Sequence, residues 1–183
     1  MTGFKLEFSK TAYIVDFAVY LAVPAVVLWA LLRFGPRSAW PDMAAVAVAG
    51  LAGWTLLEYF LHRFVLHGVQ PFKYWHEQHH LRPYALIGTP TVFSLLLFAI
   101  FVFVPAWLFG SVWTGAALSL GVIAGYAVYS WVHHAVHHWR AHAGWPKRRK
   151  QLHAIHHHAQ DGCNYGVITA FWDRVFGTYV DLP

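Results

Sequence analysis

Most of the 14 histidines in this sequence fall into four short clusters. The clusters are HRFVLH from His62, HEQHH from His76, HHAVHH from His133 and HAIHHH from His153. Side chains three or four residues apart share one face of an α-helix, so one helical face can carry the imidazoles of His76, His79 and His80, of His133 and His137, or of His153, His156 and His157. Neutral imidazole is the commonest metal ligand in proteins. The clusters therefore predict a metal site.

The first cluster fits this pattern less well, because His62 and His67 are five residues apart. We expect the two rings to meet a common metal only if their side chains reach around the helix or the last helical turn unwinds.

The ligand types bear on the number of metals. Cys163 is the single cysteine, so the chain has neither an internal disulfide nor a cysteine-based metal site. Structural zinc sites typically have four ligands and frequently include thiolates. About ten histidines without cysteine favour a pair of metals with open coordination positions, which is a catalytic arrangement. Imidazole suits zinc, copper, iron and nickel, so the donor atoms alone leave the metal open.

The rest of the chain is typical of a membrane protein, since 58% of its 183 residues are hydrophobic and only 11% are charged. A helix needs about 20 apolar residues to cross a bilayer. Four segments satisfy this requirement: residues 12–32, 43–61, 91–109 and 112–132. The second and fourth apolar runs continue through His67 and His138. We expect one all-α integral membrane domain, residues 1–183, in which residues 62–90 and 133–183 form a cytosolic, histidine-rich helical cap that binds the metals.

The charges predict an orientation for these four helices. The second and fourth helices end on the side of the N-terminus, so the histidine clusters share one face. Of the 13 lysines and arginines, only Arg33 and Arg37 fall on the other side, and the positive-inside rule then makes the histidine face and both termini cytoplasmic. We expect a protein of the bacterial inner membrane or of another membrane that faces the cytosol. The run KRRK, residues 147–150, suits anionic lipid headgroups or an acidic protein partner, and no nucleic-acid binding is expected.

Between Leu57 and Tyr179 the sequence resembles the fatty acid hydroxylase and sterol desaturase superfamily of membrane oxygenases with histidine boxes. The segments that carry the resemblance are EYFLHRFVLH, HEQHH, GYAVYSWVHHAVHH, HAIHHH and NYGVITAFWDRVFGTY. In this order they are most similar to the lipid 2-hydroxylase branch. One departure is that the third box usually begins Tyr-Asp, whereas Tyr129 is followed here by Ser130.

The resemblance also implies which residues bind metal. The implied ligands are His62, His67, His76, His79, His80, His133, His137, His153, His156 and His157. The additional histidines are His134, His138, His142 and His158. The side chains that could orient the ligating rings are Glu58, Tyr129, Asp161, Asn164 and Asp173. No catalytic residue beyond the metal ligands is implied.

The activity implied by the resemblance is that of an oxidoreductase with two iron ions and O2 as co-substrate. It would hydroxylate a membrane lipid, as in 2-hydroxylation of a fatty acid or fatty-acyl lipid. Zinc can replace iron in purified protein, because the usual affinity order disfavours ferrous iron. We expect electrons from a separate carrier, either a cytochrome b5-like protein or a ferredoxin. The oligomeric state is not predicted.

Other functions remain open at this point. A carotenoid hydroxylase, or a sterol desaturase or oxidase of the same superfamily, would apply the same chemistry to another lipid. We favour a fatty-acyl lipid, because its 2-position lies near the headgroup plane, where the histidines are expected. A membrane metal transporter would need polar ligands along its spans, whereas the expected spans contain few polar residues, such as Asp16 and Glu58.

Overall fold

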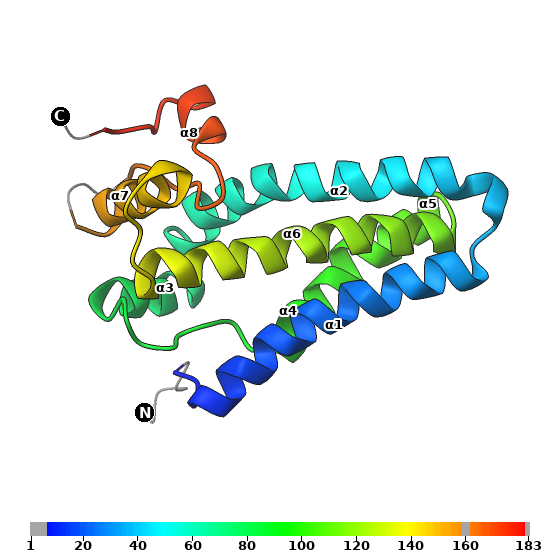
Figure 1. Ribbon diagram of the computed structural model, residues 1–183, viewed down its shortest axis with the longest axis horizontal. Helices are drawn as coiled ribbons and strands as arrows, with labels where there is room; N and C mark the ends of the chain where they lie inside the picture. The colour runs from blue at the N-terminus through cyan, green and yellow to red at the C-terminus, as the bar shows by residue number, and fades with distance from the viewer. Residues whose placement is uncertain (1–6, 159–161, 182–183) are drawn as a thin grey trace. The chain divides into compact units, whose positions relative to one another are not determined.

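The computed structural model describes residues 7–158 and 162–181. Its helices are α1 (Lys10–Phe34), η1 (Arg37–Ala39), α2 (Trp40–Phe60), η2 (Leu61–Leu66), α3 (Phe72–Leu81), α4 (Thr91–Phe98), η3 (Ala99–Phe103), α5 (Val104–Phe109), α6 (Val112–His138), α7 (Gly144–His158) and α8 (Phe171–Val175) (Figure 1). The described residues form no strand beyond one isolated bridge between Glu7 and Ile87. The prediction of an all-α protein is confirmed.

Four helical segments are long and apolar enough to cross a membrane: Lys10–Phe34, Arg37–Leu66, Thr91–Phe109 and Val112–His138. They coincide with the four predicted segments, and three of them are longer than predicted. The reason is physical, because about 20 apolar residues are the minimum for crossing, and a helix can continue beyond the hydrocarbon into polar residues. The fourth helix continues through His138, as expected. The cytoplasmic orientation and the single domain stay predictions.

The chain forms two compact units. Unit 1 contains residues 1–54 and 86–127, and unit 2 contains residues 55–85 and 128–183. Every histidine cluster lies in unit 2. Its interior combines apolar side chains such as Leu152 and Val167 with fully or nearly fully buried polar ones such as His62, Asn164 and Asp173. Buried polar groups are costly unless they have partners, so unit 2 is built around polar interactions.

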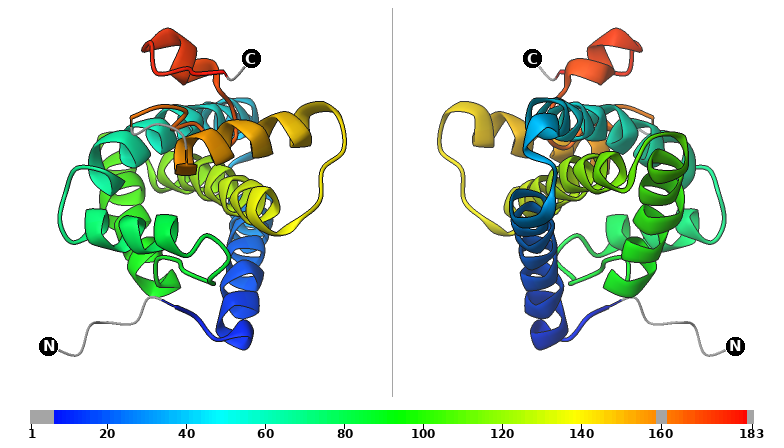
Figure 2. Two further views of the ribbon diagram at one scale, coloured as in Figure 1. Left: turned by 90° about the vertical axis from the view of Figure 1, so that its left-hand side faces the viewer. Right: turned by 90° about the vertical axis from the view of Figure 1, so that its right-hand side faces the viewer.

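Unit 1 is a helical assembly (Figures 1 and 2). Leu31 of α1, Met43 of α2 and Ala117 of α6 form one buried cluster. The rings of Trp54 and Tyr126 pack edge to face, with centroids 5.3 Å apart, and Phe98 of α4 packs against both. These contacts connect all four membrane helices of unit 1.

Helices α2 and α6 approach each other closely at Gly121. A Cβ atom at this position would lie 2.0 Å from the backbone oxygen of Ala47 and 2.7 Å from the backbone nitrogen of Leu51. Both neighbours are backbone atoms, which cannot move without shifting the helix. Glycine is therefore required here, as is common where membrane helices pack through small residues.

We predict that Gly121→Ala lowers the stability of the protein by about 1–3 kcal/mol, because the added methyl group overpacks the α2–α6 contact. The measurement is the thermal unfolding midpoint in detergent. Gly53→Ala is the matched control, since a Cβ atom at Gly53 would meet nothing within 4 Å. The control should leave the midpoint unchanged or raise it slightly. Equal midpoints for the two variants would contradict the close approach.

Candidate metal centre

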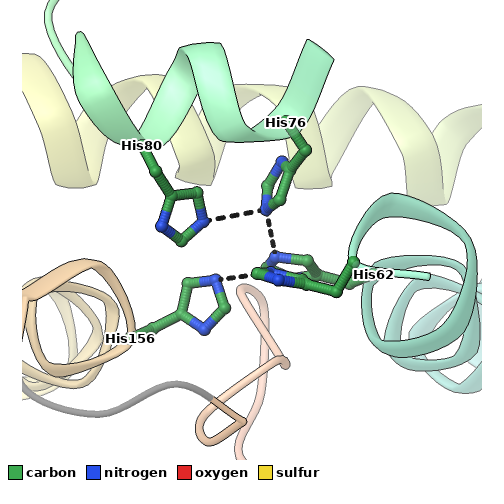
Figure 3. A group of neighbouring side chains, drawn as sticks. His62, His76, His80 and His156 are labelled. Carbon is green, nitrogen blue, oxygen red and sulfur yellow. Dashed lines mark hydrogen bonds between the residues drawn. The ribbon is translucent and has the colours of Figure 1, made fainter. Parts of the chain in front are cut away.

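The structure brings the ten implied ligand histidines together in two groups of five. The first group is His62, His67, His76, His80 and His156, and the second is His79, His133, His137, His153 and His157. Figure 3 shows four rings of the first group converging from three segments of the chain, η2, α3 and α7. The second group takes its rings from α3, α6 and α7. Both groups lie entirely within unit 2.

Helices α3 and α7 each contribute histidines to both groups, and the three histidines have the same spacing along each helix. In α3, His76 and His80 belong to the first group and His79 to the second. In α7, His153 and His157 belong to the second group and His156 to the first. Residues four apart are closer in direction around a helix than either is to the residue next to it. Each helix therefore keeps its i, i+4 pair together and directs its third histidine to the other group.

A π-helical turn solves the five-residue spacing of the first cluster. Around a regular α-helix, side chains five residues apart differ in direction by about 140°. Residues Leu61–Leu66 instead form a π-helix, in which the backbone N–H of His67 donates to the carbonyl oxygen of His62 at 3.2 Å. This i to i+5 bond brings the two ring centroids to 5.2 Å. The sequence led us to expect long-reaching side chains or an unwound last turn, whereas the turn stays helical and widens to the π form.

The spacing of the ring nitrogens matches the surroundings of a single ion. Within each group, one ring nitrogen of every histidine lies within 4.8 Å of those of the other members. The Nε2 atom of His76 is 2.9 Å from that of His62 and 3.0 Å from that of His80. In the second group, Nε2 of His153 is 2.8 Å from that of His137. Ligands held by metal–nitrogen bonds of about 2.1 Å are separated by distances of this size.

The rings are in the protonation state that metal binding requires. Burial, reinforced by neighbouring imidazoles, holds the pKa of His76 and His153 well below the usual value. The same causes lower the pKa of His79 to about 3, and burial lowers that of His156 to about 3. These four rings are therefore neutral near pH 7, and each retains a lone pair for a metal ion.

Buried nitrogens without partners also fit a metal. Among the described residues, both ring nitrogens of His79 and Nε2 of His133 are buried and make no hydrogen bond. Leaving such an atom unsatisfied costs about 1–3 kcal/mol. Coordination to a metal ion would satisfy the lone pair of each ring, so the donor set fits two metal ions.

Backbone carbonyl groups fix two rings of the first group. Nδ1 of His62 donates to the oxygen of Tyr165 at 2.6 Å, and Nδ1 of His156 donates to the oxygen of Cys163 at 2.8 Å. A carbonyl oxygen only accepts hydrogen bonds, so Nδ1 carries the proton in each neutral ring. Nε2 therefore keeps a free lone pair, and it is the atom that faces the other rings of the group.

The loop that supplies these carbonyls, residues 163–168, is held by two buried carboxylates. Asp173 accepts hydrogen bonds from the backbone N–H of Tyr165 at 2.8 Å and of Gly166 at 2.9 Å. Oε1 of Glu58 accepts from the N–H of Val167 at 2.5 Å and of Ile168 at 3.1 Å. Both were among the residues that the sequence named as able to orient the ligand rings, and they contact this loop rather than the imidazoles themselves.

The remaining residues of that set have different positions. Asn164 lies in the same loop with a φ of 52°, a left-handed conformation that asparagine tolerates, and its side chain exchanges two hydrogen bonds with the backbone of Val180. The ring of Tyr129 stacks on His133, with centroids 5.6 Å apart. Asp161 lies outside the described residues.

The four additional histidines lie outside both groups. His138, His142 and His158 are exposed, and His134 is half-buried and stacks on His138. The role of the ten grouped histidines as metal ligands stays a prediction.

The basic run at residues 147–150 is engaged largely within unit 2. Arg149 is buried, Arg148 pairs with Asp181, and Nζ of Lys150 donates to the carbonyl oxygens of Val136 and Trp139. Lys147 is exposed, whereas Arg148 and Lys150 are partly buried. The interpretation of this run as a surface patch for an acidic partner is therefore not supported by its contacts.

Two contributions to the site were missed in the sequence. The carbonyl oxygens of Cys163 and Tyr165 belong to the backbone, so residue type carries no signal for them. Thr178 was also missed, although its hydroxyl donates to Asp173 at 2.8 Å. The nearest sequence signal for the loop that carries these carbonyl groups was the segment NYG beside a histidine box, because asparagine and glycine often mark a tight turn.

All ten grouped histidines fall within residues 47–178, the segment that matches the model of the fatty acid hydroxylase family. The chain belongs to the fatty acid hydroxylase family. Members of this family are metal-dependent oxygenases. A solved structure described as full-length scs7p, with only the hydroxylase domain visible, matches this family member with a TM-score of 0.81 at 25% identity, over 93% of this chain and 67% of that one.

Curated relatives of this fatty acid hydroxylase family member have related names. It is 33% identical to the dihydroceramide fatty acyl 2-hydroxylase FAH2 of Arabidopsis thaliana, over 75% of this chain and 62% of the relative. It is 32% identical to the ceramide very long chain fatty acid hydroxylase scs7 of Schizosaccharomyces pombe, over 72% of this chain and 41% of the relative. It is 30% identical to the fatty acid 2-hydroxylase of Mus musculus, over 73% of this chain and 39% of the relative. The chain thus spans less than two thirds of the length of these relatives.

We predict that Asp173→Asn weakens metal binding in the first group by about 10- to 100-fold, because an amide nitrogen cannot accept the loop's hydrogen bonds. The carbonyl acceptors of His62 and His156 would then lose their fixed positions. The measurement is metal content per chain after dialysis against a chelator. Asp181→Asn is the control, since Asp181 is exposed and pairs with Arg148 and Tyr179, which lie outside the two histidine groups. Wild-type retention in Asp173→Asn would contradict the role of the loop.

Proposed function

We propose that this protein is a di-iron, O2-dependent hydroxylase that introduces a hydroxyl group at the 2-position of a fatty acid or fatty-acyl lipid. The observation that carries the proposal is the pair of five-histidine groups inside a segment that matches the fatty acid hydroxylase family. The ten ligands and the bracing residues Glu58, Asn164 and Asp173 form the proposed site, together with Tyr129 beside His133.

The donor set supports iron and a pair of ions. Each group offers five imidazoles, which suit borderline metals such as ferrous iron and leave room for another ligand. Zinc also suits these donors and binds more tightly in the usual affinity order, so purified protein can carry zinc.

When bound, the iron pair would supply the redox chemistry that activates O2 for insertion of one oxygen atom into an unactivated C–H bond. The overall reaction balances as lipid C–H, O2, two electrons and two protons giving lipid C–OH and water. Burial holds rings such as those of His153 and His156 neutral, and the carbonyl groups of Cys163 and Tyr165 orient the rings of His156 and His62. Burial of His62, His153 and His156, each below 5% exposed, keeps bulk water away from the reacting centre.

The relatives support a fatty-acyl substrate over the carotenoid and sterol alternatives. All three are named for hydroxylation of fatty acids or of the fatty acyl part of ceramide. The transporter alternative has less support, because both histidine groups lie in one compact unit instead of being distributed along the spans.

The proposed reaction needs an electron donor, for which we propose a separate cytochrome b5-like protein or ferredoxin. We also propose that the histidine-bearing unit faces the cytosol, in a bacterial inner membrane or another membrane with a cytosolic face. The distribution of lysine and arginine along the sequence supports this orientation.

We predict two metal ions per chain in the wild-type protein, with iron required for activity. Elemental analysis of protein purified after growth with added iron measures the ratio, and reconstitution with zinc provides the inactive comparison. His137→Ala should lower the metal content, because it removes a ligand of the second group. A wild-type ratio of one metal or none would overturn the di-metal proposal.

We predict that expression in a heterologous host with a donor system yields fatty-acyl species heavier by one oxygen atom, about 16 Da. The measurement is lipid mass spectrometry. His157→Ala should abolish the new species, because it removes a ligand. His142→Ala is the control and should retain activity, because His142 is exposed and outside both groups. Hydroxylated sterols or carotenoids with unchanged acyl chains would assign the protein to the alternative substrates.

A further inference from the structure

We propose that α8 is an interfacial membrane anchor whose apolar face lies in the lipid bilayer beside the second membrane-spanning helix. This helix lies outside the four candidate spans. It nevertheless exposes Phe171 by 55% and Val175 by 54%, and the following Phe176 by 42%. Large apolar side chains gathered at one exposed site indicate a surface that meets a membrane or another protein.

The orientation of α8 is fixed by the residue on its opposite side. Asp173 is 0% exposed, and its carboxylate accepts hydrogen bonds from the N–H groups of Tyr165 and Gly166 and from the hydroxyl of Thr178. Phe171 and Val175 are four residues apart and share the face that points away from Asp173. Rotating α8 to bury them would break three hydrogen bonds to a buried charge. The apolar face therefore stays outward.

The contacts of α8 place it against the second candidate span, Arg37–Leu66. Nε1 of Trp172 donates to Oγ1 of Thr55 at 2.9 Å. The ring of Phe176 stacks on Tyr59 with a centroid distance of 5.2 Å and lies 5.5 Å from that of Phe60. These contacts all lie within unit 2.

The apolar surface of α8 is continuous with apolar surface on the span itself. Phe60 and Phe64 are 39% and 51% exposed, and their rings stack with centroids 5.7 Å apart. Phe176 extends this row from the span to α8. A surface that begins on a membrane-spanning helix and continues through neighbouring aromatic rings onto α8 favours lipid as its occupant over a soluble protein.

The level of these contacts along the span also fits the bilayer boundary. A segment of 30 residues is about 45 Å long at about 1.5 Å per residue, whereas the hydrocarbon core is about 30 Å thick. The last residues of the span therefore reach the headgroup region, where aromatic rings are enriched. Arg63 lies among these rings, and Arg174 is exposed on α8, so both can meet lipid phosphates at the rim of the surface.

The test is the depth of spin labels in nanodiscs of phosphatidylcholine and phosphatidylglycerol, each containing one copy of the protein. Single labels are placed by Phe171→Cys or Val175→Cys, and by Lys147→Cys as an exposed control, in a Cys163→Ala background. We expect collisions with O2 to exceed collisions with a water-soluble nickel chelate at positions 171 and 175, and the reverse at position 147. Nickel accessibility at 171 and 175 equal to that at 147 would overturn the proposal.

A second measurement uses the unmodified protein, so it does not depend on the folding of the variants. A lipid with a photoactivatable acyl chain is incorporated, and cross-links are mapped after trypsin digestion. We expect cross-links in the peptides 151–174 and 175–183, at Phe171, Val175 or Phe176. A second copy would be the occupant if these residues carry no lipid cross-links and are shielded from solvent only in discs that hold several copies. That result would overturn the membrane anchor. Neither readout depends on hydroxylation, so this proposal can fail independently of the proposed function.

Discussion

The hydrogen bonds from His62 and His156 to two backbone carbonyl groups are the constraint on which the rest of unit 2 depends. An imidazole can bind a metal only through a nitrogen that lacks a proton, and the carbonyl groups of Tyr165 and Cys163 determine which nitrogen that is. Carbonyl groups can do this only if the loop that carries them is immobile. Residues 163–168 are therefore braced from three sides, by Glu58 of α2, by Asp173 of α8 and by Asn164 through the C-terminal segment.

This arrangement explains why a small unit tolerates so many buried polar groups. Asp173 has no exposed surface, yet the described structure gives its carboxylate three hydrogen-bond donors. A buried carboxylate is costly without such partners and stabilising with them. Removing one donor leaves the buried carboxylate with too few hydrogen bonds. The loop, α8 and the two histidines therefore behave as a single cooperative element.

The sequence predicts the membrane helices well because crossing a bilayer imposes a direct length requirement on apolar residues. It also identifies the ten histidines, through their family resemblance. Their division into two groups does not follow from sequence, because His79 and His80 are adjacent and only the placement of α3 decides which group each joins. Glu58, Asn164 and Asp173 were named from sequence, but their common target is backbone, which has no residue-type signature. Arg149 shows the same difficulty for charge, since composition alone does not distinguish a surface cation from a buried one.

The π-turn at Leu61–Leu66 amounts to a change of phase within one continuous helix. Upstream of it, side-chain directions are set by what the span packs against, and downstream they are set by the imidazole cluster. The turn lets these two requirements be satisfied independently, because rotating one part does not require rotating the other. Substitutions in the span at positions before Glu58 can therefore accumulate without disturbing the ligands. An insertion or deletion between His62 and His67 would disturb the ligands, since one residue more or fewer would direct a ring away from its group.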